Sequence, residues 1–370
     1  MKILFALFTG VLFCINVHAQ GCVAIRHFSC GGTNLNGAVL TAGDLTMGTS
    51  YRYFRSFRHF QGSHEEPDRV ANNTEVINYA HALDINLLYA LSGRTYATLT
   101  LPFVSNVRSS LYEHGRDERY SSFSRGLADA RVGLGHWFRS PVAHDFSLAA
   151  GLGIKLPTGD HTASDIFYNV GPDGHPEVRP VDQSIQPGDG GIGLTLDFQA
   201  YQRLSSALSL YGNGFYLLSP RETNGIRTFR ETLSPVLANE AIMSVPDQYS
   251  VRLGLNYLPT ASPVSGALGI RYEGVPVEDL VGGSGGFRRP GSVFSIEPGV
   301  SYMFSGVSLD VSVPIALIRN RPQSVTDRET ERLTGTPRNG DAAFADYLIN
   351  VGFTYRLNRG TETQPLPETF

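Results

Sequence analysis

Residues 146–160 read Phe-Ser-Leu-Ala-Ala-Gly-Leu-Gly-Ile-Lys-Leu-Pro-Thr-Gly-Asp. Large apolar side chains recur along one parity from Phe146 to Leu156, and small or polar side chains dominate the other parity. This two-residue period predicts a β-strand with two unlike faces. The polar face carries Lys155, the only lysine of the chain besides Lys2. That face must look into water or counter-charges, whereas the apolar face can meet either a protein core or lipid.

The same alternation recurs on both sides of this stretch. Its clearest repeat is the segment 77–91, where an apolar parity from Ile77 to Leu91 is broken only by His81. Counting such segments predicts about twelve strands. They start near residue 44 and continue at 77–91, 95–111, 126–138, 146–156, 192–202, 208–218, 249–257, 267–273, 293–304, 307–317 and 345–357.

Connections between these strands alternate strictly between short and long. The short ones lie near Gly93, Pro141, Ser205, Thr260 and Gly306, and the long ones lie around His64, Arg116, His175, Glu231, Gly283 and Glu331. A soluble all-β sandwich has no reason to place every long loop at one end, but an outer-membrane barrel does, because its periplasmic turns are short and its external loops long. We therefore predict an all-β fold: a transmembrane antiparallel up-and-down β-barrel over residues 44–357.

Aromatic residues support this orientation. Tyr89, Phe138, Tyr257 and Phe304 each stand just before a short turn. Rings at that depth are typical of the aromatic girdle at one membrane interface.

The first residues predict export. Lys2, an apolar run to Ile15 and a Val-His-Ala end at Ala19 are typical of a secretory signal peptide, residues 1–19. With a barrel behind it, this signal predicts the outer membrane of a Gram-negative bacterium, and outer-membrane lipid as a partner. Residues 20–43 are then an N-terminal periplasmic or plug segment, and residues 358–370 a periplasmic tail.

Cys22 and Cys30 remain after removal of the signal, in an oxidising compartment. A disulfide between them is the primary prediction. Lipidation of Cys22 is the alternative, although Gln20 fits such a site poorly and Cys30 would be left without a partner. The formal net charge of -4 over 370 residues, without a basic run, excludes nucleic acid as an expected partner.

Charged residues of the inward parity are the candidate pore lining. They are Asp84, Asp129, Arg131, Lys155, Asp197, Arg252, Arg271, Glu273, Glu297 and Asp310. Because both signs occur, these side chains could pair as a structural network across the interior, or they could line a permeation path. The structural role is favoured for most of them, and Lys155 is the first candidate for a functional lumen residue.

Two segments carry a family resemblance. Residues 126–134, Gly-Leu-Ala-Asp-Ala-Arg-Val-Gly-Leu, followed by 151–160, Gly-Leu-Gly-Ile-Lys-Leu-Pro-Thr-Gly-Asp, resemble the outer-membrane barrel family named for the meta-pathway of phenol degradation. The resemblance implies a transporter barrel for passive uptake of small, aromatic or otherwise hydrophobic, solutes.

Catalytic and metal sites find little support in the sequence. A lipid-modifying barrel enzyme would need a serine and a histidine together near the lipid face, and His81 has no serine of its own parity beside it. His64-Glu65-Glu66 and Asp173-Gly174-His175 lack the ligand spacing of a recognised cation site. We therefore expect no enzyme activity, cofactor or metal. The alternative to a channel is a structural or adhesive barrel with a sealed lumen.

Overall fold

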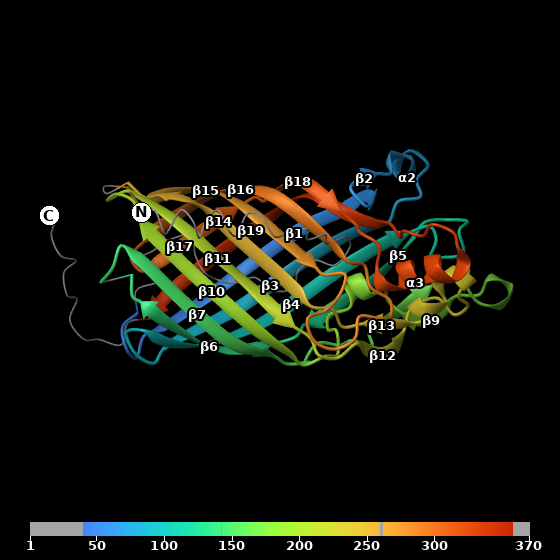
Figure 1. The fold of residues 1–370 in the computed structure, drawn as a ribbon, viewed down its shortest axis with the longest axis horizontal. Helices are drawn as coiled ribbons and strands as arrows, with labels where there is room; N and C mark the ends of the chain where they lie inside the picture. Colours follow the sequence, from blue (N-terminus) through green and yellow to red (C-terminus); the bar gives the residue numbers. More distant parts are fainter. Residues whose placement is uncertain (1–39, 142, 260–261, 358–370) are drawn as a thin grey trace.

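The computed structural model describes residues 40–357 except 142, 260 and 261, and these residues form a closed antiparallel β-barrel with twelve wall strands (Figure 1). Ten wall positions hold one strand each: β1 (Leu45–Gln61), β3 (Ile77–Ala90), β4 (Thr95–Ser110), β7 (Phe146–Lys155), β10 (Gly193–Arg203), β11 (Leu208–Leu218), β14 (Gln248–Tyr257), β15 (Val264–Val275), β16 (Gly291–Phe304) and β19 (Ala342–Leu357). The other two hold consecutive pieces: β5 (Tyr120–Leu127) with β6 (Arg131–Arg139), and β17 (Val307–Ser312) with β18 (Ile315–Asn320). The predicted signal peptide, the Cys22–Cys30 pair and the C-terminal tail lie outside the described residues.

The first and last strands close the barrel. Leu45 of β1 lies opposite Tyr89 of β3 on one side and opposite Leu357 of β19 on the other. Every other neighbouring pair is antiparallel and adjacent in the chain. The predicted up-and-down barrel of twelve strands is confirmed.

The two faces of the wall follow the predicted parity. In β7, Leu152 and Ile154 are 54% and 45% exposed, whereas Ser147 and Ala149 are fully buried. Tyr89, Phe138, Tyr257 and Phe304 are all exposed at the ends of their strands, next to the short turns. An apolar outer belt with aromatic residues at one rim is the surface of a barrel that stands in lipid.

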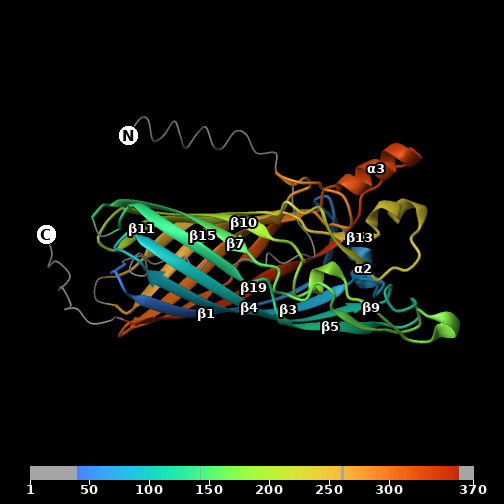
Figure 2. The same cartoon turned by 90° about the horizontal axis from the view of Figure 1, so that it is seen from below.

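The two ends of the barrel differ in the length of their connections. The short turns lie together at the left end in Figure 1, and their described residues are 91–94, 140–141, 143–145, 204–207, 258–259, 262–263 and 305–306. The long loops, residues 62–76, 111–119, 156–192, 219–247, 276–290 and 321–341, extend from the right-hand end (Figures 1 and 2). The predicted alternation therefore corresponds to the two mouths.

The long loops contain short elements of their own. These are β2 (His64–Glu65), α2 (Pro67–Ala71), β8 (Ser164–Phe167), η2 (Pro172–Gly174), β9 (Glu177–Pro180), η3 (Gln183–Ile185), β12 (Thr223–Arg227), η4 (Pro235–Glu240), β13 (Ile242–Ser244) and α3 (Val325–Thr334). Helix α3 begins with a capping box between Ser324 and Asp327 and ends at Gly335, which adopts a left-handed φ of 67°. No helix within the described ranges is long and apolar enough to cross a membrane.

Two strands differ from the sequence prediction because proline interrupts the hydrogen-bond ladder. The expected strand 126–138 begins earlier, at Tyr120, and breaks over residues 128–130, where Ala128 N–H donates to the carbonyl of Pro102 on β4 (2.7 Å). The expected strand 307–317 breaks at residues 313–314, because Pro314 has no N–H to donate. The first break positions the loop described next.

Candidate functional site: the lumen and its inward-folded loop

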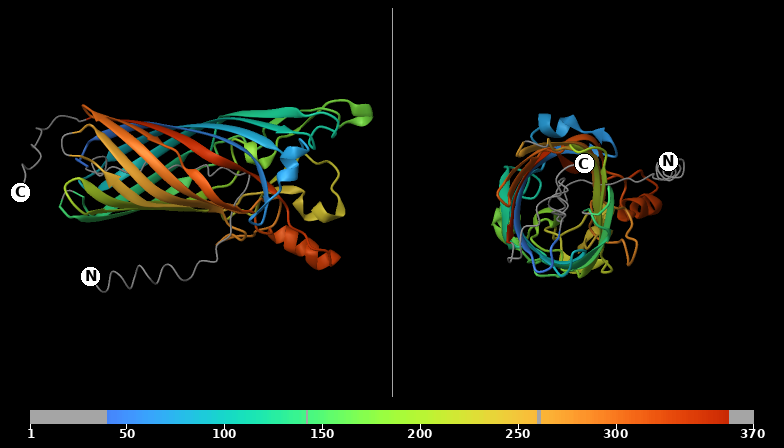
Figure 3. Two further views of the ribbon diagram at one scale, coloured as in Figure 1. Left: turned by 90° about the horizontal axis from the view of Figure 1, so that it is seen from above. Right: turned by 90° about the vertical axis from the view of Figure 1, so that its left-hand side faces the viewer.

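The loop between β7 and β10, residues 156–192, folds back into the barrel. Its first part carries the β8–β9 hairpin at the external end, and its second part, from Val181 to Asp189, is largely buried. Asn106 of β4 donates to the carbonyl of Ile185 (3.2 Å), and Ser124 of β5 donates to the same oxygen. Seen along the barrel axis, green loop segments cross the interior of the ring (Figure 3). This inward-folded loop narrows the lumen near the external mouth.

The two distinctive sequence segments meet at the start of this loop. The Asp129 carboxylate accepts from the N–H groups of Gly159 (3.0 Å) and Asp189 (3.1 Å). Lys155, 3% exposed at its side chain, donates to both carboxylate oxygens of Asp189 and has its Nζ 3.7 Å from Oδ2 of Asp129. One buried ammonium thus lies between two carboxylates and joins the end of β7 to the returning loop.

Thr158 and two glycines complete this junction. The Thr158 hydroxyl accepts from Ala130 N–H (2.8 Å) and donates to the Ala128 carbonyl (2.8 Å), which satisfies the backbone left open by the break between β5 and β6. Gly159 and Gly188 pack backbone to backbone, since a Cβ on Gly188 would lie 2.3 Å from the Gly159 oxygen. The Pro-Thr-Gly-Asp turn therefore acts as a structural junction.

A second buried ion cluster holds the tip of the loop. Arg289, from the loop after β15, forms two hydrogen bonds of 2.8 Å with the Asp182 carboxylate, and Arg108 of β4 lies 3.5 Å from it. Burial alone raises the pKa of Asp182, but the two guanidinium groups outweigh it and hold that pKa far below its usual range. Arg108 also pairs with Glu113 (2.7 Å). The tip is thus tied both to the wall and to a second loop.

Further external loops cover this assembly. Gln183 donates to the carbonyl of Ser244 (2.6 Å), and the rings of Phe167 and Phe229 stack with centroids 5.8 Å apart. Met243 and Val245 are fully buried. The loops after β7, β11 and β15 therefore form one packed external cap.

Deeper in the lumen, the predicted charged residues pair across neighbouring strands. Arg252 donates hydrogen bonds of 2.9 and 2.7 Å to the Glu297 carboxylate, and Ser312 donates to the same carboxylate (2.8 Å). Arg271 binds Glu273 (2.7 Å) and approaches Glu297 (3.9 Å). These pairs form the lumen network on β14, β15 and β16.

The remaining predicted residues also face inward. Arg131 Nη2 lies 3.8 Å from Asp84 Oδ2. Asp310 of β17 accepts from Ser308 (2.9 Å), and Asp197 of β10 is half-buried. The structure thus brings most of the predicted charges into ion pairs. Whether these residues line a permeation path stays a prediction.

Sequence reasoning missed an aromatic cluster on the inner wall near the short turns. Tyr96, Trp137, Tyr201 and Tyr211 project inward from β4, β6, β10 and β11 and pack around Ala149. The Trp137 and Tyr201 rings lie 6.1 Å apart. We refer to these four rings as the lumen aromatic cluster.

A signal for this cluster did exist in the glycines beneath the rings. A Cβ on Gly135, opposite Tyr96, would lie 2.2 Å from the Tyr96 ring, and one on Gly254, opposite Tyr211, would lie 2.7 Å from the Tyr211 hydroxyl. Glycine directly opposite or diagonal to an inward aromatic residue on neighbouring strands is thus the pattern that could have revealed the cluster.

The outer wall gives one correction. Ser105 of β4 lies directly opposite His81 of β3, on the same outward face, so a serine does stand beside this histidine. The described hydrogen bond of His81 joins its Nδ1 to the Tyr51 hydroxyl (2.7 Å), and none joins it to Ser105. His81 therefore has a structural partner on the outer wall.

In one of the two loops predicted to lack a cation site, an acid is paired with the barrel wall. Glu65 binds Arg58 with hydrogen bonds of 2.7 and 2.5 Å. Across the part of the chain that the structure describes, no group of three or more metal-ligating side chains converges.

Comparison with known proteins places the fold. No protein-family model matches the chain, and no curated protein matches its sequence. A solved outer-membrane channel of Pseudomonas putida F1 matches 90% of this chain and 100% of its own, at 13% identity and a TM-score of 0.54. The β domain of the Bordetella autotransporter BrkA covers 85% and 100% at 13% identity and a TM-score of 0.43. The P. putida toluene transporter TodX covers 92% and 98% at 8% identity and a TM-score of 0.42.

Of these three similarities, only the first has a TM-score above 0.5, and it shows that the chain shares this barrel fold. The chain has the architecture of Gram-negative outer-membrane barrels, which confirms the predicted fold and location. The finer resemblance to the phenol meta-pathway family stays a prediction, since no family model matches.

Proposed function

We propose that this barrel is an outer-membrane channel for passive uptake of small solutes, aromatic or otherwise hydrophobic. The solute path runs through a narrow lumen past the inward-folded loop, the lumen network and the lumen aromatic cluster. The candidate lining includes Lys155, Asp129 and Arg131. Transport runs down a gradient, because the sequence contains no nucleotide-binding loop or energy-coupling segment.

The observation that carries the proposal is the lumen aromatic cluster. Inward positions of a water-filled barrel are ordinarily polar. Here four aromatic rings lie together on the inner wall, below charged residues that are paired with one another. Aromatic faces offer stacking partners to a planar apolar solute, and paired charges leave little net field to repel it. A twelve-strand barrel lies between eight-strand barrels filled by side chains and open sixteen-strand porins.

The second candidate is a structural or adhesive barrel with a sealed lumen. It is favoured by the burial of the inward-folded loop, because Val181 and Asp182 are fully buried and Ile185 is 1% exposed. A lipid-modifying enzyme has less support, because the outward His81 bonds Tyr51 and has no hydrogen bond to the neighbouring Ser105 within residues 40–357 as described.

Solute flux separates these candidates. The refolded full-length barrel is placed in liposomes, and swelling is compared for phenylalanine and leucine, which as zwitterions cross lipid slowly. We expect phenylalanine to enter faster, and Trp137→Leu to remove most of that preference. Phe138→Leu is the matched control, because Phe138 is the next residue of the same strand but is 58% exposed on the outer face.

Single-channel recording on the same preparation gives the second readout. Small, steady currents support a channel. A barrel that passes neither ions nor amino acids, yet binds cells through its loops, would establish the sealed alternative instead.

A further inference from the structure

Arg52 is a buried cation on the inner wall that forms no hydrogen bond or ion pair through its side chain with the described residues. It lies on β1, is 7% exposed, and faces Asn350 of β19 on one side and Ala82 of β3 on the other. Its Nε is buried without a hydrogen bond, and no ion pair links its guanidinium to any described residue. A guanidinium carries five N–H donors, and leaving them unbonded in a buried position is costly. Such a group is suited to an acceptor that comes from outside the protein.

The carboxylates around Arg52 are already engaged. Its charge interacts with those of Asp84 and Arg131 on its own side of the barrel, and with Arg271 and Glu273 from β15. Three acids of this region each have their own arginine, in the pairs Asp84–Arg131, Glu273–Arg271 and Glu297–Arg252. Arg52 belongs to none of these three pairs. Asp310 accepts a hydrogen bond from Ser308 (2.9 Å).

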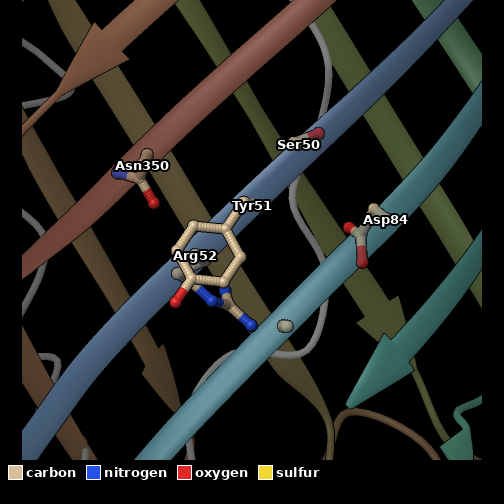
Figure 4. Close-up of a pocket in the computed structure, with 6 residues that line it drawn as sticks. Ser50, Tyr51, Arg52, Asp84 and Asn350 are labelled. Carbon is tan, nitrogen blue, oxygen red and sulfur yellow. The ribbon is translucent and has the colours of Figure 1, made fainter. Parts of the chain in front are cut away.

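A small cavity lies beside this guanidinium. Ser50, Tyr51, Arg52, Ala82, Asp84 and Asn350 line a small cavity between β19, β1 and β3, shown in Figure 4. Ala82, directly opposite Arg52, is too small to cover it. Asn350 donates to Ser312 (3.2 Å), and its own carbonyl oxygen is buried without a partner. A buried donor, Arg52 Nε, and a buried acceptor, the Asn350 side-chain oxygen, thus line the same cavity without hydrogen bonds to the described residues.

We infer that Arg52 binds the carboxylate of an organic acid on its way through the lumen. A guanidinium matches a carboxylate with two parallel N–H···O bonds, which a spherical anion cannot form. Arg52 and the lumen aromatic cluster both lie on the inner wall of the barrel. An aromatic monocarboxylate moving along the lumen could offer its carboxylate to Arg52 and its ring to the cluster. This assignment rests on the proposed channel function and narrows its solute class.

Calorimetric titration of the refolded barrel in detergent tests the inference without requiring conduction. Benzoate and benzyl alcohol are the two probes, because they share the ring and differ in the anionic group. We expect benzoate to bind more tightly, and Arg52→Gln to weaken benzoate at least tenfold while leaving benzyl alcohol unchanged, since a hydrogen bond to a charged group is lost. Arg52→Lys keeps the positive charge but lacks the two parallel N–H donors of the guanidinium, so it should give an intermediate loss of benzoate affinity.

The control and the contrary outcomes are defined by the same titration. Arg203→Gln removes a guanidinium from a half-exposed position at the short-turn end, 3.7 Å from Asp145, and should leave benzoate binding unchanged. Heat-modifiable gel mobility checks that each variant is folded. Equal benzoate affinity in wild type and Arg52→Gln, or no benzoate binding at all, would overturn the inference. Displacement of benzoate by chloride at equal concentration would overturn the carboxylate assignment.

Conductance then separates this inference from the channel proposal. Benzoate binding that depends on Arg52 in a barrel that passes no current would sustain the subsite and refute the channel. Current and amino-acid flux without Arg52-dependent benzoate binding would support the channel and refute the subsite.

Discussion

Replacing Lys155 by methionine should release the inward-folded loop. Methionine keeps much of the side-chain volume but removes the ammonium that lies between Asp129 and Asp189. Both carboxylates are at most 7% exposed at their side chains, so the change leaves two like charges buried side by side. Removing one partner of a buried ion pair costs about 3–5 kcal/mol.

That cost falls mainly on the docked loop. Asp129 belongs to the wall, whereas Asp189 belongs to the loop and can leave the lumen with it. If the full 3–5 kcal/mol opposes docking, the ratio of undocked to docked loops rises roughly a hundredfold to several thousandfold. We expect longer or larger open states in single-channel records of Lys155→Met, with little change in the unfolding of the wall itself.

A second variant tests the electrostatic origin of this effect. Lys155→Met combined with Asp189→Asn removes one charge of each sign, so most of the wild-type closure should return. Because Lys155 is the only lysine besides Lys2, the rate at which an amine-reactive reagent modifies it in wild type gives an independent measure of loop opening. Wild-type conductance in Lys155→Met, or a double variant that is as open as the single one, would refute the reasoning.

Three further results are expected. Arginine at outward Ile85 should lower the free energy of unfolding in urea by about 2–4 kcal/mol, and arginine at inward Asn86 by less; equal losses would mean that the faces are reversed. Thr158→Val should lower that free energy by about 1–3 kcal/mol for each backbone group left unbonded, whereas Thr158→Ser keeps the hydroxyl and should not lower it. Equal unfolding free energies of the two variants would contradict the structural role of the Thr158 hydroxyl. The low pKa of Asp182 contributes docking stability that is complete above its ordinary pKa of about 3.9 and is lost only as the pH falls below it. Conductance should therefore be constant from about pH 5 to 8, and Arg289→Gln should move acid opening to a higher pH; identical acid profiles would argue against this cluster.

The wall of the barrel could be predicted from sequence because each strand carries its own period. The alternation of Leu152 with Gly151 and Gly153 is local, and it indicates both the strand and its outward face. The need of Lys155 for counter-charges was predictable on the same basis, because its face was defined. The local pattern was therefore sufficient to predict the barrel architecture and to predict that the charged candidate residues face the lumen.

The contents of the lumen could not be predicted in this way. Asp189 stands 34 residues after Lys155 in a loop without periodicity, and Asp182 and Arg289 are 107 residues apart in two different loops. Such pairs depend on how the loops pack, which no local pattern records. The break at residues 128–130 was missed for a similar reason, since its cause includes Pro102 on the neighbouring strand.

The closing ladder between β1 and β19 has a consequence for assembly. Its register joins Leu45 to Leu357, so the final seam joins residues more than three hundred positions apart in the chain. Contacts of such high sequence separation form slowly, because the chain between them must be ordered first. Until β19 pairs with β1, the edge of β1 that faces β19 has unpaired backbone N–H and C=O groups. Lipid cannot form hydrogen bonds with these groups, and a strand of another chain could pair with them. Insertion into the membrane and closure of this seam should therefore be coupled, with a partner at the open edge until the last strand takes its place.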